Sequence, residues 1–315
     1  MRPSPPIRPS ARRSAGCRPR RVRLSLALLL CTFVAAGCAT PASHLHSLAG
    51  QQGFERDVVT TAGFDLMVFE NALVRAPRVE GDVLHVYLEG DGTPWIHRVL
   101  IAPDPTPRSP LMLRLMALDA APAVYVGRPC YNGTANDPGC DHSLWTSARY
   151  SDTVVDSMSA AVRLLRQRHG FESVRLFGHS GGGTLALLIA ARLPETLDVV
   201  TIAGNLDTDA WTAHHGYTPL HESLNPIDEP PLDETIAQWH LFGGGDTVVP
   251  PSVALPFVRR QRGASAALFP GFVHGCCWQR VWNGVLRAVD SGQVTALPGE
   301  VFSSPRQRAS APDGR

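Results

Sequence analysis

The clearest chemical signal in the sequence is a serine set among glycines, in Gly178-His179-Ser180-Gly181-Gly182. A short β-type run precedes this G-x-S-x-G motif, and a helical pattern follows it. A motif placed in this way puts the serine on a sharp strand-to-helix turn, where side chains at 178 and 182 would not fit. We therefore expect Ser180 to be a nucleophile that points at a helix N-terminus, where backbone amides favour negative charge.

A serine nucleophile needs a base, because its hydroxyl group is a weak nucleophile at neutral pH. In the fold that uses this turn, the chain order is serine, acid, histidine. His274 lies between the last predicted strand and the last predicted helix, so we predict that it is the base. Asp246 follows the preceding strand and a run of glycines, and we predict that it orients the imidazole. Asp207, after the strand before that, is the alternative acid.

The same chemistry requires two backbone N–H groups that bind the oxyanion. We expect one from Gly181 and the other from the loop after the third predicted strand, with Asp91 or Gly92 as the donor. Glu89 and Asp91 make this loop acidic, which would disfavour an oxyanion unless their side chains point away or bind Arg. A glycosidase site built on this pair of carboxylates is a weaker alternative.

Short strands alternate with helical stretches along the chain, as in a mostly parallel sheet flanked by crossover helices. The eight predicted strands are residues 58–61, 64–69, 83–88, 123–126, 173–177, 198–203, 236–242 and 266–269. The predicted helices are residues 111–118, 151–169, 182–192, 252–262 and 277–290. Two insertions, residues 127–150 and 205–233, follow the fourth and sixth strands, where α/β enzymes build binding loops.

The first 37 residues have the composition of a signal peptide. All 29 basic residues of the chain are Arg, and eight of them lie in the first 23 residues. An uncharged run of 13 residues follows, which is too short to span a bilayer comfortably because spanning takes about 20 residues. The run ends in Ala35-Ala36-Gly37-Cys38, which resembles the lipobox of bacterial lipoproteins. That resemblance implies cleavage before Cys38 and its acylation; a plain secretory signal is the alternative.

Composition and charge limit what the rest of the chain does. The 315 residues are 44% hydrophobic and carry a net charge of +1, which excludes disorder for the bulk of the chain. Without its first 23 residues the chain has a net charge of −7, whereas a binder of nucleic acid would need a basic surface. We predict a signal peptide at 1–37, a polar linker at 38–56, one catalytic domain at 57–290 and a polar tail at 291–315.

The strand-to-helix turn with Ser180, the acid Asp246 and the base His274 follow one another in this order. This arrangement resembles the α/β-hydrolase superfamily over roughly residues 58–290. Four further segments resemble a group of proteobacterial α/β-hydrolase lipoproteins: residues 89–92, 104–108, 128–130 and 223–226. The resemblance implies the α/β-hydrolase fold, with two loop insertions near the site. It also implies a protein held by acyl chains in the cell envelope, and Ala39 after the acylated Cys favours the periplasmic side of an outer membrane.

Four of the seven Cys remain after the signal peptide and the acylated Cys38 are set aside. In an oxidising periplasm, a disulfide between Cys130 and Cys140 would close a short loop whose Asn-Gly and Asp-Pro-Gly sequences favour turns. Cys276 and Cys277 could pair with each other or with that loop. Neither pair has the spacing of a zinc site, and a cluster of three histidines at 214, 215 and 221 is better explained by solvated loop residues.

These patterns favour a serine hydrolase of ester or other acyl bonds that acts through an acyl-enzyme and needs no cofactor and no metal. Its substrate would be a small molecule or a lipid with an acyl group. Thioesterase and peptidase activities remain alternatives within this class. A catalytically silent envelope protein that binds or scaffolds is the alternative from another class, since a fold does not guarantee activity.

Overall fold

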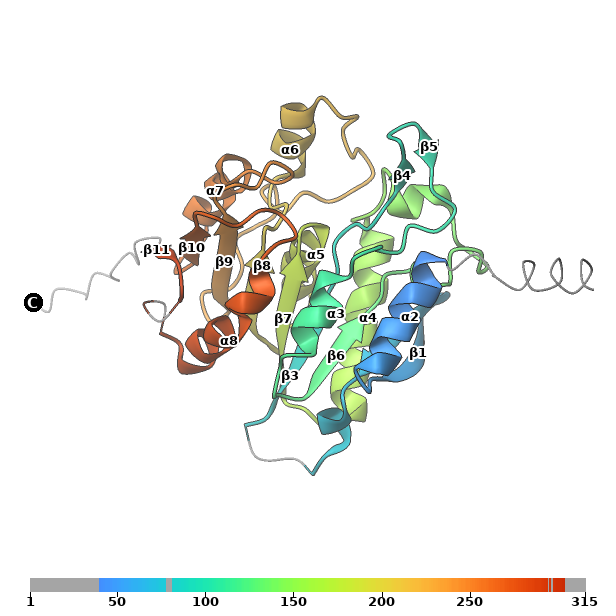
Figure 1. The fold of residues 1–315 in the computed structure, drawn as a ribbon, viewed down its shortest axis with the longest axis horizontal. Coiled ribbons are helices and arrows are strands. Elements are labelled where there is room, and N and C mark those ends of the chain that lie inside the picture. Colours follow the sequence, from blue (N-terminus) through green and yellow to red (C-terminus); the bar gives the residue numbers. More distant parts are fainter. Residues whose placement is uncertain (1–39, 78–80, 294, 296, 304–315) are drawn as a thin grey trace, which may run out of the picture. The chain divides into compact units, whose positions relative to one another are not determined.

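The structure is a computed structural model, which describes residues 40–77, 81–293, 295 and 297–303. A nine-stranded sheet runs through it in the order β1-β2-β6-β3-β7-β8-β9-β10-β11 (Figure 1). The strands are β1 (Glu55–Thr61), β2 (Phe64–Glu70), β3 (Val83–Leu88), β6 (Ala123–Val126), β7 (Ser173–His179), β8 (Thr196–Ile202), β9 (Ala237–Gly243), β10 (Ser265–Phe269) and β11 (Glu300–Ser303). The predicted signal peptide and Cys38 lie outside the described residues.

The sheet is mostly parallel, which confirms the prediction. Strands β6, β3, β7, β8, β9 and β10 pair in parallel, while β1, β2 and β11 join the two edges antiparallel. In the register of β3 with β7, Leu88 pairs with Gly178. The loop after β3 and the turn after β7 therefore leave the sheet side by side.

Helices cover both faces of the sheet, because alternate residues of each strand face opposite sides. The helices are α2 (Pro41–Gln51), α3 (Leu111–Met116), α4 (Asp152–Arg168), α5 (Gly181–Ala190), α6 (Thr208–His215), α7 (Pro251–Arg260) and α8 (Trp282–Ser291), with short 3-10 turns at Ala72–Arg75, His142–Trp145 and Trp278–Arg280. On one face α4, α5 and α7 pack on side chains such as Val86 and Leu176. On the other face α2, α3 and α8 pack on side chains such as Tyr87 and Phe177.

Three segments differ from the sequence prediction. The expected linker at 38–56 contains α2, because Leu45 and Ala49 are buried in the core on that face of the sheet although most of the segment is polar. The expected tail at 291–315 contains β11, whose backbone pairs with β10 and makes nine strands rather than eight. A small hairpin, β4 (Trp95–Ile96) and β5 (Leu100–Ile101), stands apart from the main sheet and was not predicted.

Candidate active site

Ser180 occupies the sharp turn that the sequence predicts, between β7 and α5. Its backbone has φ 54° and ψ −123°, in the left-handed range of φ that a residue with a side chain rarely adopts. A Cβ atom on Gly178 would lie 2.1 Å from the carbonyl oxygen of Gly182, and one on Gly182 would lie 2.2 Å from that of Leu88. The two glycines therefore permit the close packing that holds Ser180 in this strained position at the start of α5.

Asp246 and His274 lie together, as predicted, although 28 residues separate them. His274 Nδ1 lies 2.8 Å from Asp246 Oδ2, and the carboxylate side chain is fully buried. The other oxygen, Oδ1, accepts from the backbone amides of Val248 and Val249 at 2.8 and 2.9 Å. Burial alone would raise the pKa of Asp246, but these hydrogen bonds and the one from His274 outweigh it and lower the pKa.

Asp207, the alternative acid, has a different partner. It is the N-cap residue of α6, and its Oδ1 accepts from the amide of Ala210 at 2.9 Å. Asn225 Nδ2 donates to the same oxygen at 3.5 Å. The geometry thus joins His274 to Asp246 and leaves Asp207 with a local capping function.

His179, the variable residue before the serine, was not predicted to belong to the site. Its Nε2–H donates to the carbonyl oxygen of His274 at 3.0 Å, and the centroids of the two rings lie 4.7 Å apart. Trp278 Nε1 donates to the same carbonyl at 3.0 Å. These contacts tie the histidine turn to the serine turn. The only sequence signal for this was the position of His179 directly beside Ser180.

The acidic loop after β3 lies against the serine turn. A Cβ atom on Gly90 would lie 3.3 Å from Cβ of Ser180, and one on Gly181 would lie 1.9 Å from Asp91 Oδ1. The Gly90 amide donates to Glu89 Oε1 at 3.2 Å, and Glu89 Oε2 accepts from the amide of Met112 at 2.9 Å. Glu89 therefore uses both oxygens within the chain.

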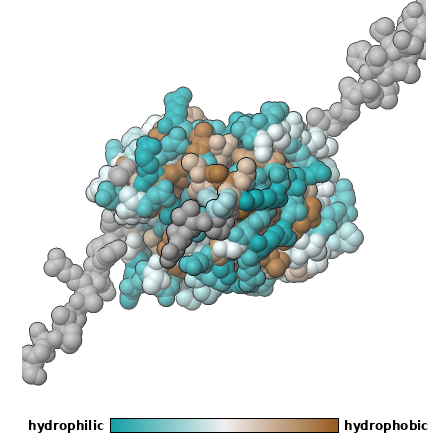
Figure 2. Space-filling model, turned by 90° about the horizontal axis from the view of Figure 1, so that it is seen from below, coloured by the Kyte–Doolittle hydropathy of each residue, from teal (hydrophilic) through white to brown (hydrophobic). Residues whose placement is uncertain are grey.

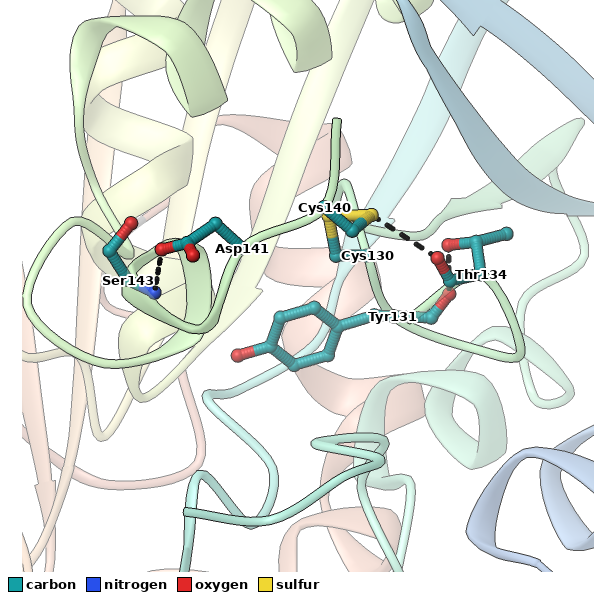
Figure 3. The surroundings of a disulfide bond; sticks show 6 residues. All are labelled: Cys130, Tyr131, Thr134, Cys140, Asp141 and Ser143. Carbon is teal, nitrogen blue, oxygen red and sulfur yellow. Dashed lines mark hydrogen bonds between the residues drawn. A yellow bond between two sulfur atoms is a disulfide. The ribbon is translucent and has the colours of Figure 1, made fainter. Parts of the chain in front are cut away.

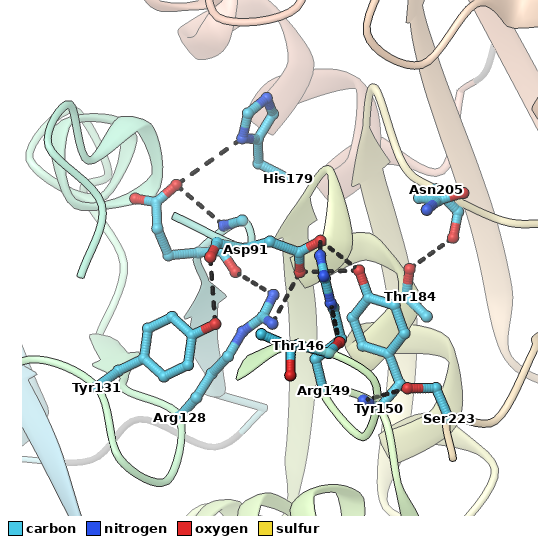
Figure 4. A network of polar contacts seen from close by, with 12 residues as sticks. Asp91, Arg128, Tyr131, Thr146, Arg149, Tyr150, His179, Thr184, Asn205 and Ser223 are labelled. Carbon is cyan, nitrogen blue, oxygen red and sulfur yellow. Dashed lines mark hydrogen bonds and ion pairs between the residues drawn. The ribbon is translucent and has the colours of Figure 1, made fainter. Parts of the chain in front are cut away.

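Asp91 is bound by two arginines, the condition under which an acidic loop is compatible with an oxyanion (Figure 4). Asp91 Oδ1 lies 2.8 Å from Arg128 Nη1, and Oδ2 lies 3.0 Å from Arg149 Nη1. Tyr150 Oη donates to the carboxylate at 2.6 Å, and Tyr131 Oη donates to the backbone oxygen of Asp91 at 3.2 Å. We call these five side chains the Asp91 network.

The electrostatics of the Asp91 network keep its carboxylate charged. Burial alone would raise the pKa of Asp91, but Arg128 and Arg149 outweigh it and lower the pKa to about 2. Burial next to the carboxylate raises the pKa of Tyr150 well above its usual value, so that the phenol keeps its proton. Two guanidinium groups beside one carboxylate therefore leave the network with a net positive charge.

Among the described residues, the backbone amides of Asp91 and Gly181 donate to no other atom of the chain, whereas the Gly90 amide is occupied. Gly92 has φ +67°, and a Cβ atom there would lie 2.0 Å from the carbonyl oxygen of Pro105. Gly92 therefore packs against Pro105, in the loop that follows the hairpin of β4 and β5. Among the described residues the Gly92 amide, like that of Asp91, donates to no other atom of the chain, so both amides are candidate partners of Gly181.

The predicted bond between Cys130 and Cys140 is present in the first insertion (Figure 3). Their Cα atoms lie 5.5 Å apart, and Cys140 Sγ contacts the carbonyl oxygen of Thr134 at 3.2 Å. The closed loop lies between Arg128 and Arg149 in the chain. Cys276 and Cys277, whose pairing the sequence left open, are joined to each other.

No group of three or more His, Cys, Asp or Glu side chains among the described residues could hold a metal ion. His215 Nε2 contacts the carbonyl oxygen of Val248 at 2.8 Å, and the rings of His214 and His215 meet edge to face. The described residues also include no helix that is long and apolar enough to cross a membrane.

No protein-family model matches the sequence, and no curated protein matches it. Among solved structures, the chain is similar to a membrane phospholipase A described as a bacterial virulence factor (17% identity, TM-score 0.53, 86% of this chain and 98% of that one). It is also similar to a puromycin hydrolase (16%, TM-score 0.54, 80% and 40%) and to an esterase of Pyrococcus furiosus (13%, TM-score 0.50, 79% and 93%). The proteobacterial lipoprotein group remains an expectation from the sequence. The sheet order and these similarities show that the chain has the α/β-hydrolase fold.

Proposed function

We propose that this protein is a serine hydrolase of ester or other acyl bonds, with Ser180, His274 and Asp246 as its catalytic triad. The observation that carries the proposal is the hydrogen bond between His274 Nδ1 and a fully buried Asp246. The ring of this histidine lies 4.7 Å from that of His179, the residue directly before Ser180 on its strained turn. The three similar structures are of hydrolases, which supports the same class.

In the proposed reaction, Ser180 Oγ attacks the carbonyl carbon while His274 Nε2 takes the hydroxyl proton. Asp246 holds the imidazole with Nε2 unprotonated and stabilises its positive form. The free amides of Gly181 and of Asp91 or Gly92 bind the oxyanion. His274 then gives the proton to the leaving group, and a water molecule activated by the same imidazole releases the acyl group. The reaction uses no cofactor.

A silent binding or scaffolding protein is the competing proposal, and the acidic loop was its main support. Two arginines offset the charge of Asp91, so that the loop does not oppose a developing oxyanion. The intact histidine–aspartate pair also favours an enzyme, because a scaffold would not require it.

A fluorophosphonate probe tests the proposal most directly, because it labels an activated serine. We expect the native protein to be labelled and Ser180→Ala to remain unlabelled. Asp246→Asn should lower kcat/KM on the order of 10⁴-fold, while the matched Asp207→Asn variant should keep its activity. Absence of labelling in the native protein would support the scaffold, and equal losses in the two Asn variants would refute the assignment of the acid. A series of p-nitrophenyl esters would then define the acyl length.

We also propose that acyl chains on Cys38 hold the protein in the cell envelope, on the periplasmic side of the outer membrane. The support is the lipobox-like sequence before Cys38 and the Ala that follows it. Mass spectrometry of the mature N-terminus should find an acylated Cys38, and Cys38→Ser should no longer sediment with membranes. An unmodified terminus at another residue would indicate a plain secretory signal.

A further inference from the structure

The hairpin of β4 and β5 exposes an apolar surface. Val99 is 72% exposed and Leu100 is 61% exposed, while Trp95 and Ile101 are 41% and 38% exposed. The turn between the strands consists of His97, Arg98 and Val99, all exposed, and His97 and Arg98 have positive φ. The hairpin thus presents aliphatic and indole side chains beside a cationic tip.

The hairpin is built on the loop of the candidate active site. Strand β4 begins four residues after Asp91. The amide of Thr93 donates to the carbonyl oxygen of Pro105 at 2.9 Å, which joins the two segments that flank the hairpin. Trp145 Nε1 donates to the carbonyl oxygen of Ala102 at 3.1 Å and braces it from the first insertion. The apolar surface and the proposed oxyanion site therefore belong to one continuous segment.

Other exposed apolar side chains belong to loops at the same end of the sheet. The described chain has twelve exposed large hydrophobic residues, and seven of them come after the carboxyl ends of parallel strands. These seven are Trp95, Val99, Leu100, Ile101, Tyr217, Val248 and Val273. Val273 adjoins His274, and Trp211 Nε1 donates to the carbonyl oxygen of Val248 at 2.8 Å.

In Figure 1 the hairpin and α6 lie at the top, above the carboxyl ends of the parallel strands. Figure 2 shows the molecule from below, where hydrophobic and hydrophilic residues are mixed. Scattered single apolar residues are ordinary for a protein surface, whereas a group around a site indicates a partner.

Helix α2, the first described element after the proposed lipid anchor in the sequence, begins near the loop that follows β5. The amide of Ala42 lies 3.3 Å from Asp104 Oδ2, and Asp104 follows β5 by three residues. Thr40 caps this helix, and Cys38 precedes it by two residues, a stretch that reaches at most about 7 Å. An acylated Cys38 therefore brings the bilayer to the end of the domain that carries the hairpin.

We propose that the hairpin end of the domain rests on the membrane that holds Cys38, and that the site takes its acyl ester substrates from the lipids of that membrane. The proposal rests on the proposed hydrolase function and on the anchor. Indole side chains prefer the interface between headgroups and acyl chains, where Trp95 would lie. Arg98 and Arg108, both exposed, would contact anionic headgroups.

Tryptophan fluorescence tests the contact, because four of the six Trp are buried and Trp95 is exposed. The acylated full chain is placed in vesicles of phosphatidylethanolamine and phosphatidylglycerol, with part of the lipid brominated on its acyl chains. We expect quenching that Trp95→Phe largely removes. Equal quenching in the native protein and in Trp95→Phe would overturn the proposed contact.

Activity tests the substrate class. In the double variant Val99→Ser/Leu100→Ser, hydrolysis of vesicle phospholipid should fall about tenfold, while hydrolysis of p-nitrophenyl acetate stays unchanged. The matched control Leu164→Ser/Leu197→Ser removes two similarly apolar side chains, 44% and 43% exposed, away from this end and should change neither activity. An unchanged rate on vesicles or an equal loss on both substrates in the hairpin variant would overturn the proposal.

Ser180→Ala separates this proposal from the hydrolase proposal. It should abolish both activities and keep the quenching by brominated lipid. If both activities survive in Ser180→Ala, the hydrolase mechanism is wrong, and with it the substrate proposal, while the quenching still reports on the membrane contact.

Discussion

Two networks of arginine and carboxylate groups, each built on buried arginine, lie at opposite ends of the parallel strands. At the carboxyl ends, Asp91 is held by Arg128 and Arg149 (Figure 4). Toward the amino ends, Arg175 on β7 pairs with Asp198 on β8 at 2.8 Å and also with Asp290 on α8. Both networks remove charges from water, which is costly unless every charge is paired.

The difference lies in what holds each network in place. Arg175 and Asp198 belong to neighbouring strands, and the backbone ladder already aligns them. Asp91, Arg128 and Arg149 belong to irregular loops, which no ladder positions. The second network therefore contributes to stability alone, whereas the Asp91 network also fixes the backbone that carries the proposed oxyanion donors. Similar chemistry serves the fold at one end of the sheet and the site at the other.

The largest contrast should come from matched Asp→Asn changes. Asp91→Asn leaves two buried guanidinium groups without a counter-charge and loosens the loop, so kcat/KM should fall by about 10²–10³-fold, as when an oxyanion donor is lost. Asp198→Asn should destabilise the fold by about 3–5 kcal/mol yet leave the kcat of the folded protein unchanged. Urea unfolding and ester hydrolysis measure the two effects. A similar loss of kcat in both variants would mean that the networks do not differ in function.

The sequence predicted those parts of the molecule in which local pattern and tertiary structure agree. All eight predicted strands are present with ends within three residues of those observed. The turn at Ser180 was predictable because its glycines are required by close backbone packing, and the pairing of His274 with Asp246 followed from chain order. Helix α2 was missed because only one narrow side of it is apolar.

The unpredicted features depend on contacts that no local pattern encodes. Arg128 and Arg149 reach Asp91 across 37 and 58 residues of sequence. The hairpin turn uses His97 and Arg98 at positive φ rather than the Asn or Gly that signals such turns. Strand β11 forms because β10 offers a free edge for backbone pairing, which does not depend on a hydrophobic pattern.

The disulfide between Cys130 and Cys140 should affect the Asp91 network more than the network of Arg175. Closing the loop of 10 residues between Cys130 and Cys140 restricts the unfolded chain, so Cys130→Ser/Cys140→Ser should lower the free energy of unfolding by about 3 kcal/mol. Because Arg128 lies two residues from Cys130, kcat/KM should also fall, but by less than in Asp91→Asn. Reduction of the Cys276→Ser/Cys277→Ser variant gives the control, since it opens the same loop alone. A stability loss with full activity would show that the loop does not position Arg128.

Lowering the pH should have a smaller effect, on the stability that the charge of Asp91 contributes to the fold. The folded pKa of Asp91 is about 2 against an ordinary value of 3.8, so its charge stabilises the fold above pH 3.8 and this contribution is lost as the pH falls through 2. The shift corresponds to about 2 kcal/mol. The stability difference between the native protein and Asp91→Asn should therefore shrink by about that amount from pH 5 to pH 2. A constant difference over this range would show that Asp91 is not held ionised by its arginines.

The smallest effect concerns the pH at which His274 becomes a base. Burial lowers its pKa below 6.5, a positive His179 lowers it further, and the charges of Asp246 and Asp91 raise it. Because the base must be neutral, kcat/KM should rise with pH and reach half its plateau below pH 6.5. Asp91→Asn removes a negative charge and should move this midpoint to lower pH. His179→Asn removes the imidazole that lowers the pKa of His274 and should move the midpoint to higher pH. Asp198→Asn, at the other end of the sheet, should leave it in place. Shifts of the same sign in Asp91→Asn and His179→Asn would show that the midpoint reports general loosening of the site rather than the charge of the Asp91 network.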